Sequence, residues 1–145
     1  MNNIIIVNIV NEFLIGFKSN PKLKIDIVGA VHITQALVPI AEIAGFSTRI
    51  IDPRESFANR KRFGTTEISN DFPDVALTKT RPNCRTAVIL LTHDPKLDDP
   101  ALQIALQSEA FYIGALGSKK THQKRINRLK QAGFTEKQID RVHGP

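Results

Sequence analysis

One stretch of the sequence, residues 112–121, combines residue types that suit the binding of an anion. A short apolar run passes through two glycines into a strongly basic segment. A helix that begins there would present unpaired N–H groups, Ser118 could cap it, and two lysines would add charge beside it. The pattern predicts either a phosphate-binding turn or an ordinary strand-to-helix turn. The candidate binding residues are Gly114, Gly117, Ser118, Lys119 and Lys120.

A second group of residues resembles part of a dinucleotide-binding site. Gly29 supplies only the first glycine of the fingerprint G-x-G-x-x-G, and Val31 would crowd an approaching pyrophosphate. Asp52 follows 23 positions after Gly29, where a ribose-binding carboxylate is expected, and Arg54 could instead meet a 2′-phosphate. NAD(P) binding is therefore one hypothesis. The candidate residues are Gly29, Ala30, Val31, His32, Asp52 and Arg54.

A third candidate is the pair His93 and Asp94, which Asp98 and Asp99 follow closely. A histidine beside carboxylates could serve acid–base chemistry or bind a cation. The alternative is structural, with the carboxylates capping a turn and a helix while His93 packs at a strand end. The spacing matches no recognised metal site, so we assign no metal ligand and no catalytic residue.

Short apolar runs alternate with segments of helical spacing along most of the chain. The expected strands cover residues 24–28, 46–51, 66–68, 86–91 and 110–115, and the expected helices 32–44, 98–108, 119–132 and 135–142. Pro39 should kink the first helix or shift its start. The alternation predicts an α/β, Rossmann-like, doubly wound and mainly parallel sheet flanked by helices. We expect this domain to cover residues 23–145, after an N-terminal strand or linker at 1–22.

This fold brings the candidate residues together. Ligands of doubly wound sheets bind beyond the carboxyl ends of the strands. The segments 29–32, 52–54, 92–94 and 114–120 each follow an expected strand, and each is polar or rich in glycine. We therefore expect all four at one edge of the sheet.

Charge and composition narrow the function classes. The chain of 145 residues has a net charge of +6, and residues 118–145 carry it all, with eight basic and two acidic side chains. Such a localised charge argues against a general nucleic-acid binder and suggests a solvated helix face. A single cysteine excludes an internal disulfide and suits the cytoplasm. The apolar start is too short and too polar for a membrane span, so we expect no membrane partner.

Taken together, these motifs resemble the Rossmann domain of the XdhC/CoxI family, which are accessory proteins for molybdenum hydroxylases such as xanthine dehydrogenase. The resemblance covers residues 23–145. It rests on Gly29-Ala30-Val31-His32, Asp52-Pro53-Arg54, Leu91-Thr92-His93-Asp94 and the stretch from Tyr112 to Thr121. The last of these and the His-Asp pair are the most distinctive.

The resemblance implies a maturation factor. Such proteins bind the molybdenum cofactor (molybdopterin), protect it while a cysteine desulfurase partner installs its terminal sulfur, and deliver it to the hydroxylase. The cofactor carries a phosphate or a dinucleotide, which the turn at 117–120 would hold, while His32, Asp52, His93 and Asp94 line the mouth. This role favours a cofactor-binding chaperone over an enzyme.

The chain departs from the family pattern at both ends. The family has a separate domain ahead of this one and continues after His143-Gly144-Pro145 into another strand and helix. We therefore expect a sheet truncated at its C-terminal end, with an exposed edge that favours a partner or a homo-oligomer. An NAD(P)-dependent oxidoreductase and a truncated, non-catalytic interaction domain remain the alternatives.

Overall fold

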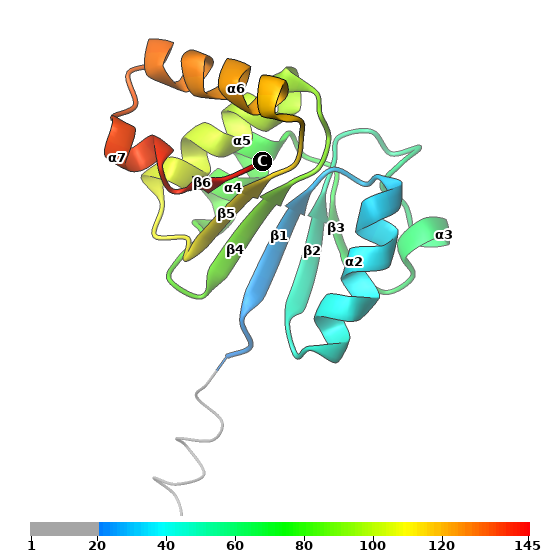
Figure 1. Ribbon diagram of the computed structural model, residues 1–145. Helices are drawn as coiled ribbons and strands as arrows, with labels where there is room; N and C mark the ends of the chain where they lie inside the picture. The colour runs from blue at the N-terminus through cyan, green and yellow to red at the C-terminus, as the bar shows by residue number, and fades with distance from the viewer. Residues whose placement is uncertain (1–20) are drawn as a thin grey trace, which may run out of the picture.

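The computed structural model describes residues 21–145, which form an α/β domain with one six-stranded sheet (Figure 1). The prediction of a strand or linker at 1–22 lies almost wholly outside the described residues. The strands are β1 (Lys24–Val28), β2 (Ser47–Ile51), β3 (Glu67–Ser69), β4 (Thr86–Leu90), β5 (Tyr112–Ala115) and β6 (Val142–His143). The helices are α2 (His32–Ile43), α3 (Arg60–Phe63), α4 (Pro73–Thr80), α5 (Pro95–Gln107), α6 (Lys119–Gln131) and α7 (Glu136–Ile139).

All five neighbouring strand pairs are parallel, and the strand order is β3-β2-β1-β4-β5-β6. The order reverses between β1 and β4, which lie side by side with Lys24 opposite Thr86. This is the doubly wound topology that the alternating pattern predicts. Its point of reversal is where ligands of open α/β sheets bind.

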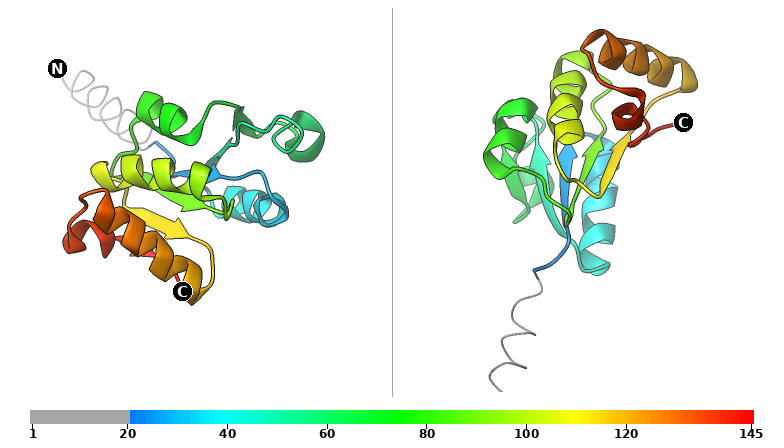
Figure 2. Two further views of the ribbon diagram at one scale, coloured as in Figure 1. Left: turned by 90° about the horizontal axis from the view of Figure 1, so that it is seen from above. Right: turned by 90° about the vertical axis from the view of Figure 1, so that its left-hand side faces the viewer.

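The two faces of the sheet are covered unequally. Helix α2 packs on one face, whereas α4 and α5 lie on the other (Figure 2), where Leu129 of α6 belongs to the same apolar cluster. The side of α2 buries Ile27 and Ile50, and the opposite side buries Val88, Leu90 and other side chains against α5. On the side of α2, no described helix covers β4, β5 and β6.

Most expected elements form within a few residues of their predicted bounds, with three differences. Helix α5 begins at Pro95 instead of residue 98, because Asp94 caps it and a proline suits the first helical position. Helix α2 starts at His32 and runs through Pro39 without interruption. The last expected helix ends at Ile139, and Val142 instead belongs to β6, which pairs with β5.

Two helices and a buried ion pair were absent from the sequence interpretation. The short helix α3 forms in the polar stretch before β3, and α4 follows β3. Asp26 and Arg49 lie opposite each other on β1 and β2, and the Arg49 Nη2 atom is 2.8 Å from the Asp26 carboxylate. Arg49 also donates to Thr80 at the end of α4, so the ion pair fastens α4 to the sheet.

Candidate functional site

The four predicted binding segments lie at one edge of the sheet, as expected from their positions after parallel strands. They follow β1, β2, β4 and β5, whose carboxyl ends all point to the same edge. The predicted placement of the four segments at one edge of the sheet is therefore confirmed. What each segment can do depends on its own contacts.

The crevice between β1 and β4 is narrow at Gly29. This residue has a φ of +112°, and a Cβ atom there would lie 2.8 Å from the Thr92 Cγ2 and 3.1 Å from the Thr92 nitrogen. Glycine is thus required both for the backbone conformation and for the close approach of two strand ends. Helix α2 then begins without a side-chain cap, because Val31 occupies the N-cap position. Within the described residues, no side chain caps its first N–H groups, which follow the carboxyl end of β1.

Asp52 is a buried structural acceptor. Its Oδ1 accepts hydrogen bonds from the backbone N–H and the Nε of Arg54, and its Oδ2 accepts from Nη2 of Arg54 and the N–H of Ala30. Burial alone would raise the pKa of Asp52, but these bonds outweigh it and hold the pKa below its usual value. A carboxylate has about four acceptor sites, and here all four are used within the protein.

Arg54 is therefore the part of this segment that can meet a ligand. Its side chain is 37% exposed and its guanidinium lies over the ring of Phe57, 4.6 Å from the centroid. The bonds to Asp52 raise the pKa of Arg54 and fix its orientation. Cofactor binding by Asp52 and Arg54 stays a prediction, and of the two side chains only that of Arg54 is exposed.

The His93–Asp94 segment is a helix cap. His93 adopts a left-handed conformation with a φ of +60°, and the Asp94 carboxylate accepts a 2.9 Å hydrogen bond from the N–H of Lys96 in the first turn of α5. Asp94 therefore caps α5, as the structural alternative predicts. Among residues 21–145, no three His, Cys, Asp or Glu side chains gather in a way that could hold a metal ion.

The turn before α6 has the geometry of an anion cradle. The Ser118 side chain caps the helix by accepting a 3.1 Å bond from the N–H of Thr121. Within the described residues, the N–H groups of Lys119 and Lys120 keep no partner, and both side chains are exposed. Gly117 has a φ of +154°, and a Cβ there would lie only 3.2 Å from the Thr121 side chain. Glycine therefore suits this position both for the backbone conformation and for the close approach of Thr121.

Gly114 leaves room for the side chain of Tyr112. A Cβ on Gly114 would lie 2.7 Å from the Tyr112 ring, because that ring folds back over the glycine. The side chain of Tyr112 therefore occupies the space over Gly114, and cofactor binding by Gly114 stays a prediction. Any ligand on this side meets the tyrosine ring first.

Arg125 is the main residue that the sequence interpretation missed. The charge run of α6 predicts a solvated face, but the Arg125 side chain is only 2% exposed. Its Nη2 donates to the Leu116 carbonyl at 2.9 Å, and its Nη1 is 3.5 Å from the Ala115 carbonyl. The guanidinium thus holds the turn before Gly117 from beneath. Within the part of the chain that the structure describes, its buried Nε has no hydrogen-bond partner.

The partner of Arg125 is Asp98 on α5, whose carboxylate lies 3.7 Å from Nη2. Thr92 donates to the same carboxylate from the end of β4 at 2.5 Å. Burial raises the pKa of Asp98 despite the bond from Thr92 and the charge of Arg125. The pair therefore links the β4 end to the β5 end below the mouth. In the sequence, Arg125 lies four residues before the apolar Leu129, and this helical spacing indicates that both side chains face inward.

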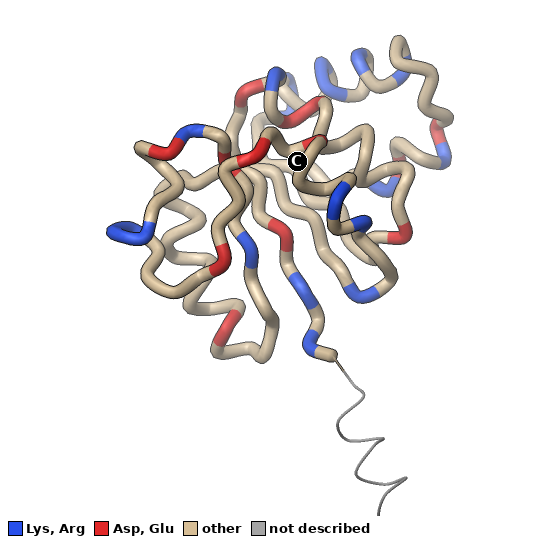
Figure 3. The backbone as a smooth tube through the Cα atoms, turned by 180° about the vertical axis from the view of Figure 1, so that it is seen from behind, with Lys and Arg blue, Asp and Glu red and all other residues tan. Residues whose placement is uncertain are grey.

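The basic residues of α6, whose positions are coloured blue in Figure 3, differ in their ion pairing. Arg128 binds both carboxylate oxygens of Asp99, and Lys130 lies 3.0 Å from Glu136. Lys119 and Lys120, in contrast, form no ion pair with any described residue. Among the described residues, the exposed lysines of α6 without an ion pair are therefore Lys119 and Lys120 in the first turn, beside the cradle, and Lys124 one turn further along. No helix in residues 21–145 is long and apolar enough to cross a membrane.

Comparison with known proteins adds three findings. The sequence model of the XdhC Rossmann domain matches residues 25–145. The chain is 30% identical over 135 residues to the molybdenum cofactor insertion chaperone PaoD of Escherichia coli (strain K12), which covers 93% of this chain and 36% of PaoD. A solved structure described as a xanthine dehydrogenase from Bacillus halodurans matches with a TM-score of 0.71 and 32% identity, covering 86% of this chain and 35% of that one.

A more distant match concerns the fold alone. The WlbA dehydrogenase of Chromobacterium violaceum, solved with NADH and UDP-GlcNAcA, has a TM-score of 0.56 at 12% identity. The match covers 88% of this chain and 36% of the WlbA chain. The chain thus spans about a third of the length of each of these relatives.

Proposed function

Because this chain belongs to the XdhC Rossmann domain family, we propose that it binds the molybdenum cofactor and takes part in the maturation of a xanthine-dehydrogenase-type molybdenum hydroxylase in the cytoplasm. The proposal rests on the family and on the likeness to PaoD, which is named as a molybdenum cofactor insertion chaperone. In the same proposal, a cysteine desulfurase partner sulfurates the cofactor while it is held.

The residues at the mouth fit a phosphate-bearing cofactor. The observation that carries the proposal is the turn before α6, where two N–H groups without a partner among the described residues lie beside Gly117 and the exposed side chains of Lys119 and Lys120. Arg125 holds this turn in place, so the cradle is formed before any ligand arrives. Lys119 and Lys120 would hold the phosphate, while Arg54 and the uncapped start of α2 would face the rest of the ligand.

The mouth is suited to holding and releasing a ligand. Asp52 and Asp94 both accept hydrogen bonds from the protein, and Asp98 is paired beneath the surface. The bound cofactor itself supplies redox-active molybdenum chemistry, and the role proposed for the protein groups is to bind and orient it.

The test measures cofactor retention. The chain is purified from a molybdenum-replete host, and bound molybdopterin is quantified by the fluorescence of its oxidised form. We expect the double variant Lys119→Glu, Lys120→Glu to lose most of the bound cofactor, because two attractive charges at the cradle become repulsive. Lys22→Glu with Lys137→Glu is the matched control, since it changes the same charge at exposed positions, one just before β1 at the opposite edge of the sheet and one on α7.

The outcomes separate the proposals. Equal retention by the two double variants, with both folded by circular dichroism, would refute the assigned cradle. Calorimetric titration with NADH and NADPH tests the alternative, and micromolar binding of either would favour an oxidoreductase. The filled acceptor sites of Asp52 count against ribose recognition.

A further inference from the structure

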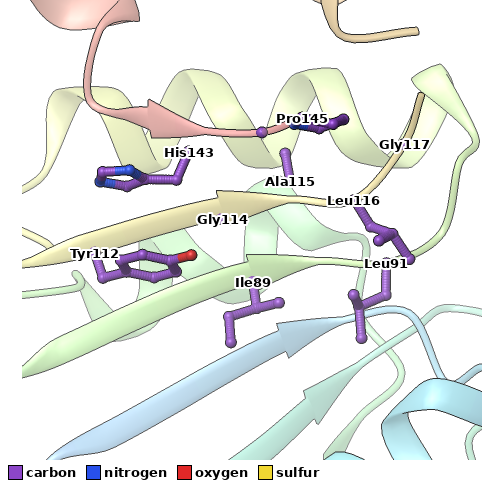
Figure 4. A pocket seen from close by; sticks show the side chains of 10 residues that line it. Ile89, Leu91, Tyr112, Gly114, Ala115, Leu116, Gly117, His143 and Pro145 are labelled. Atoms are coloured by element: carbon purple, nitrogen blue, oxygen red, sulfur yellow. The ribbon is translucent and has the colours of Figure 1, made fainter. Parts of the chain in front are cut away.

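A groove lies on the half of the sheet that α2 leaves uncovered. It has a volume of about 360 Å³, within the range of small-molecule sites, and runs along β5 between β4 and the end of the chain (Figure 4). Its apolar wall consists of Ile89, Leu91, Leu116 and Pro145. Leu91 is buried in the apolar cluster that includes α2, Ile89 and Leu116 are partly buried against that cluster, and Pro145 is exposed.

Two stacked aromatic rings close one end of the groove. The rings of Tyr112 and His143 are nearly parallel, with an interplanar angle of 3° and centroids 4.8 Å apart. Both side chains line the groove and remain exposed. The tyrosine ring lies flat over the sheet because Gly114 has no side chain. The pair therefore offers a rigid aromatic surface, fixed by the backbone beneath it.

The other end of the groove opens at the anion cradle. Leu116 and Gly117 line the groove, and Lys119 and Lys120 follow at the start of α6. The Tyr112 ring lies at the level of Gly114, so the two ends are separated by three residues of extended chain, or about 10 Å. This is the scale of a fused heteroaromatic ring that carries a phosphate arm.

We propose that this groove binds the planar heteroaromatic ring of a phosphorylated cofactor, with the ring against Tyr112 and His143 and the phosphate at the first turn of α6. The inference rests on the proposed function and specifies how that ligand lies. Apolar walls match the faces of the ring, the aromatic pair adds stacking, and the charge at the cradle matches the phosphate. A second protein copy would gain from the walls but would leave the cradle unused.

The experiment uses phosphorylated neopterin, a fluorescent pterin, and neopterin without phosphate as probes of the full chain. We expect the phosphorylated probe to bind with quenched fluorescence and neopterin to bind more weakly. Tyr112→Leu should weaken the binding of both probes about tenfold, because stacking on one aromatic side chain is worth about that factor. Tyr112→Phe should retain binding, since the hydroxyl plays no part in stacking.

Two further variants give the test its controls. Phe111→Leu removes the neighbouring exposed ring, which does not line the groove, and should leave binding unchanged. Ile89→Trp should block the groove from its wall and abolish binding of both probes. Lys119→Ala with Lys120→Ala should weaken only the phosphorylated probe.

The failure of this inference is distinguishable from that of the proposed function. If the chain retains molybdenum cofactor through Lys119 and Lys120 but Tyr112→Leu and Ile89→Trp leave probe binding unchanged, the groove is not the ring site and the inference is overturned. Absence of probe binding to the unmodified chain overturns it as well. So does a change of oligomeric state in Tyr112→Leu without any change in probe binding, because the groove would then be an interface between copies.

Discussion

Replacing Arg125 by methionine tests whether the buried cation fastens the two halves of the site. Arg125→Met keeps much of the side-chain volume but leaves the Asp98 carboxylate buried without its ion-pair partner. Removing one member of a buried pair costs about 3–5 kcal/mol. The carbonyls of Ala115 and Leu116 lose their donor as well, so we expect a loss of about 4 kcal/mol at pH 7.

This loss should depend on pH in a defined direction. Burial already raises the pKa of Asp98, and loss of the nearby cation raises it further. The native state of the variant then binds a proton more tightly than the unfolded state does. The destabilisation is therefore complete above the native pKa and decreases as the pH falls through that value towards the unfolded one.

Urea unfolding followed by far-ultraviolet circular dichroism measures the effect at pH 7 and at pH 4.5. The control is Arg128→Met on the same helix, whose ion pair with Asp99 is partly exposed and should be worth at most about 1 kcal/mol. If Arg125→Met loses no more free energy of unfolding than the control does, the pair does not fasten the site. The same conclusion follows if the loss does not shrink at the lower pH.

Three other substitutions test separate parts of the mouth. Gly29→Ala should destabilise the domain by more than about 1 kcal/mol in urea unfolding, and by more than Gly45→Ala, where φ is also positive but the space is open. Ser118→Ala should cost about 1 kcal/mol through loss of the α6 cap, measured in the same way. Asp52→Asn should cost about 2 kcal/mol at neutral pH. Because the native pKa of Asp52 is lowered, its contribution is present above the unfolded pKa and is lost as the pH falls through the native one, so thermal unfolding of variant and parent should converge in acid.

The arrangement of the fold could be predicted because its signals are local. Strand β4 is a nearly continuous apolar run, β1 buries Ile25, Ile27 and Val28 around Asp26, and glycines after α2 and α6 mark the helix ends. The parallel order follows from the alternation, and with it the meeting of four strand ends at one edge. Helix α4 was missed because it is short and its mean hydropathy is low, so no amphipathic period stands out.

The chemistry of the mouth was predicted less completely because it depends on pairing across the sequence. Asp52 suggests a ligand contact when considered alone, yet its acceptor sites are filled by Ala30 and Arg54. Arg125 looks like one more exposed charge of α6, and only packing against α5 reveals its buried partner. The need for a glycine at position 114 likewise depends on the rotamer of Tyr112, which the sequence does not specify.

The point of reversal in strand order also has a consequence for folding. Strands β1 and β4 pair directly although about sixty residues separate them, whereas β1 with β2 and β4 with β5 are joined by single crossovers. Closing the longer loop carries the larger entropic cost, so we expect the two halves of the sheet to join late. The crevice at Gly29 and Thr92 exists only once they have joined. A ligand that spans this seam would bind the completed domain alone and would stabilise it against unfolding by mass action.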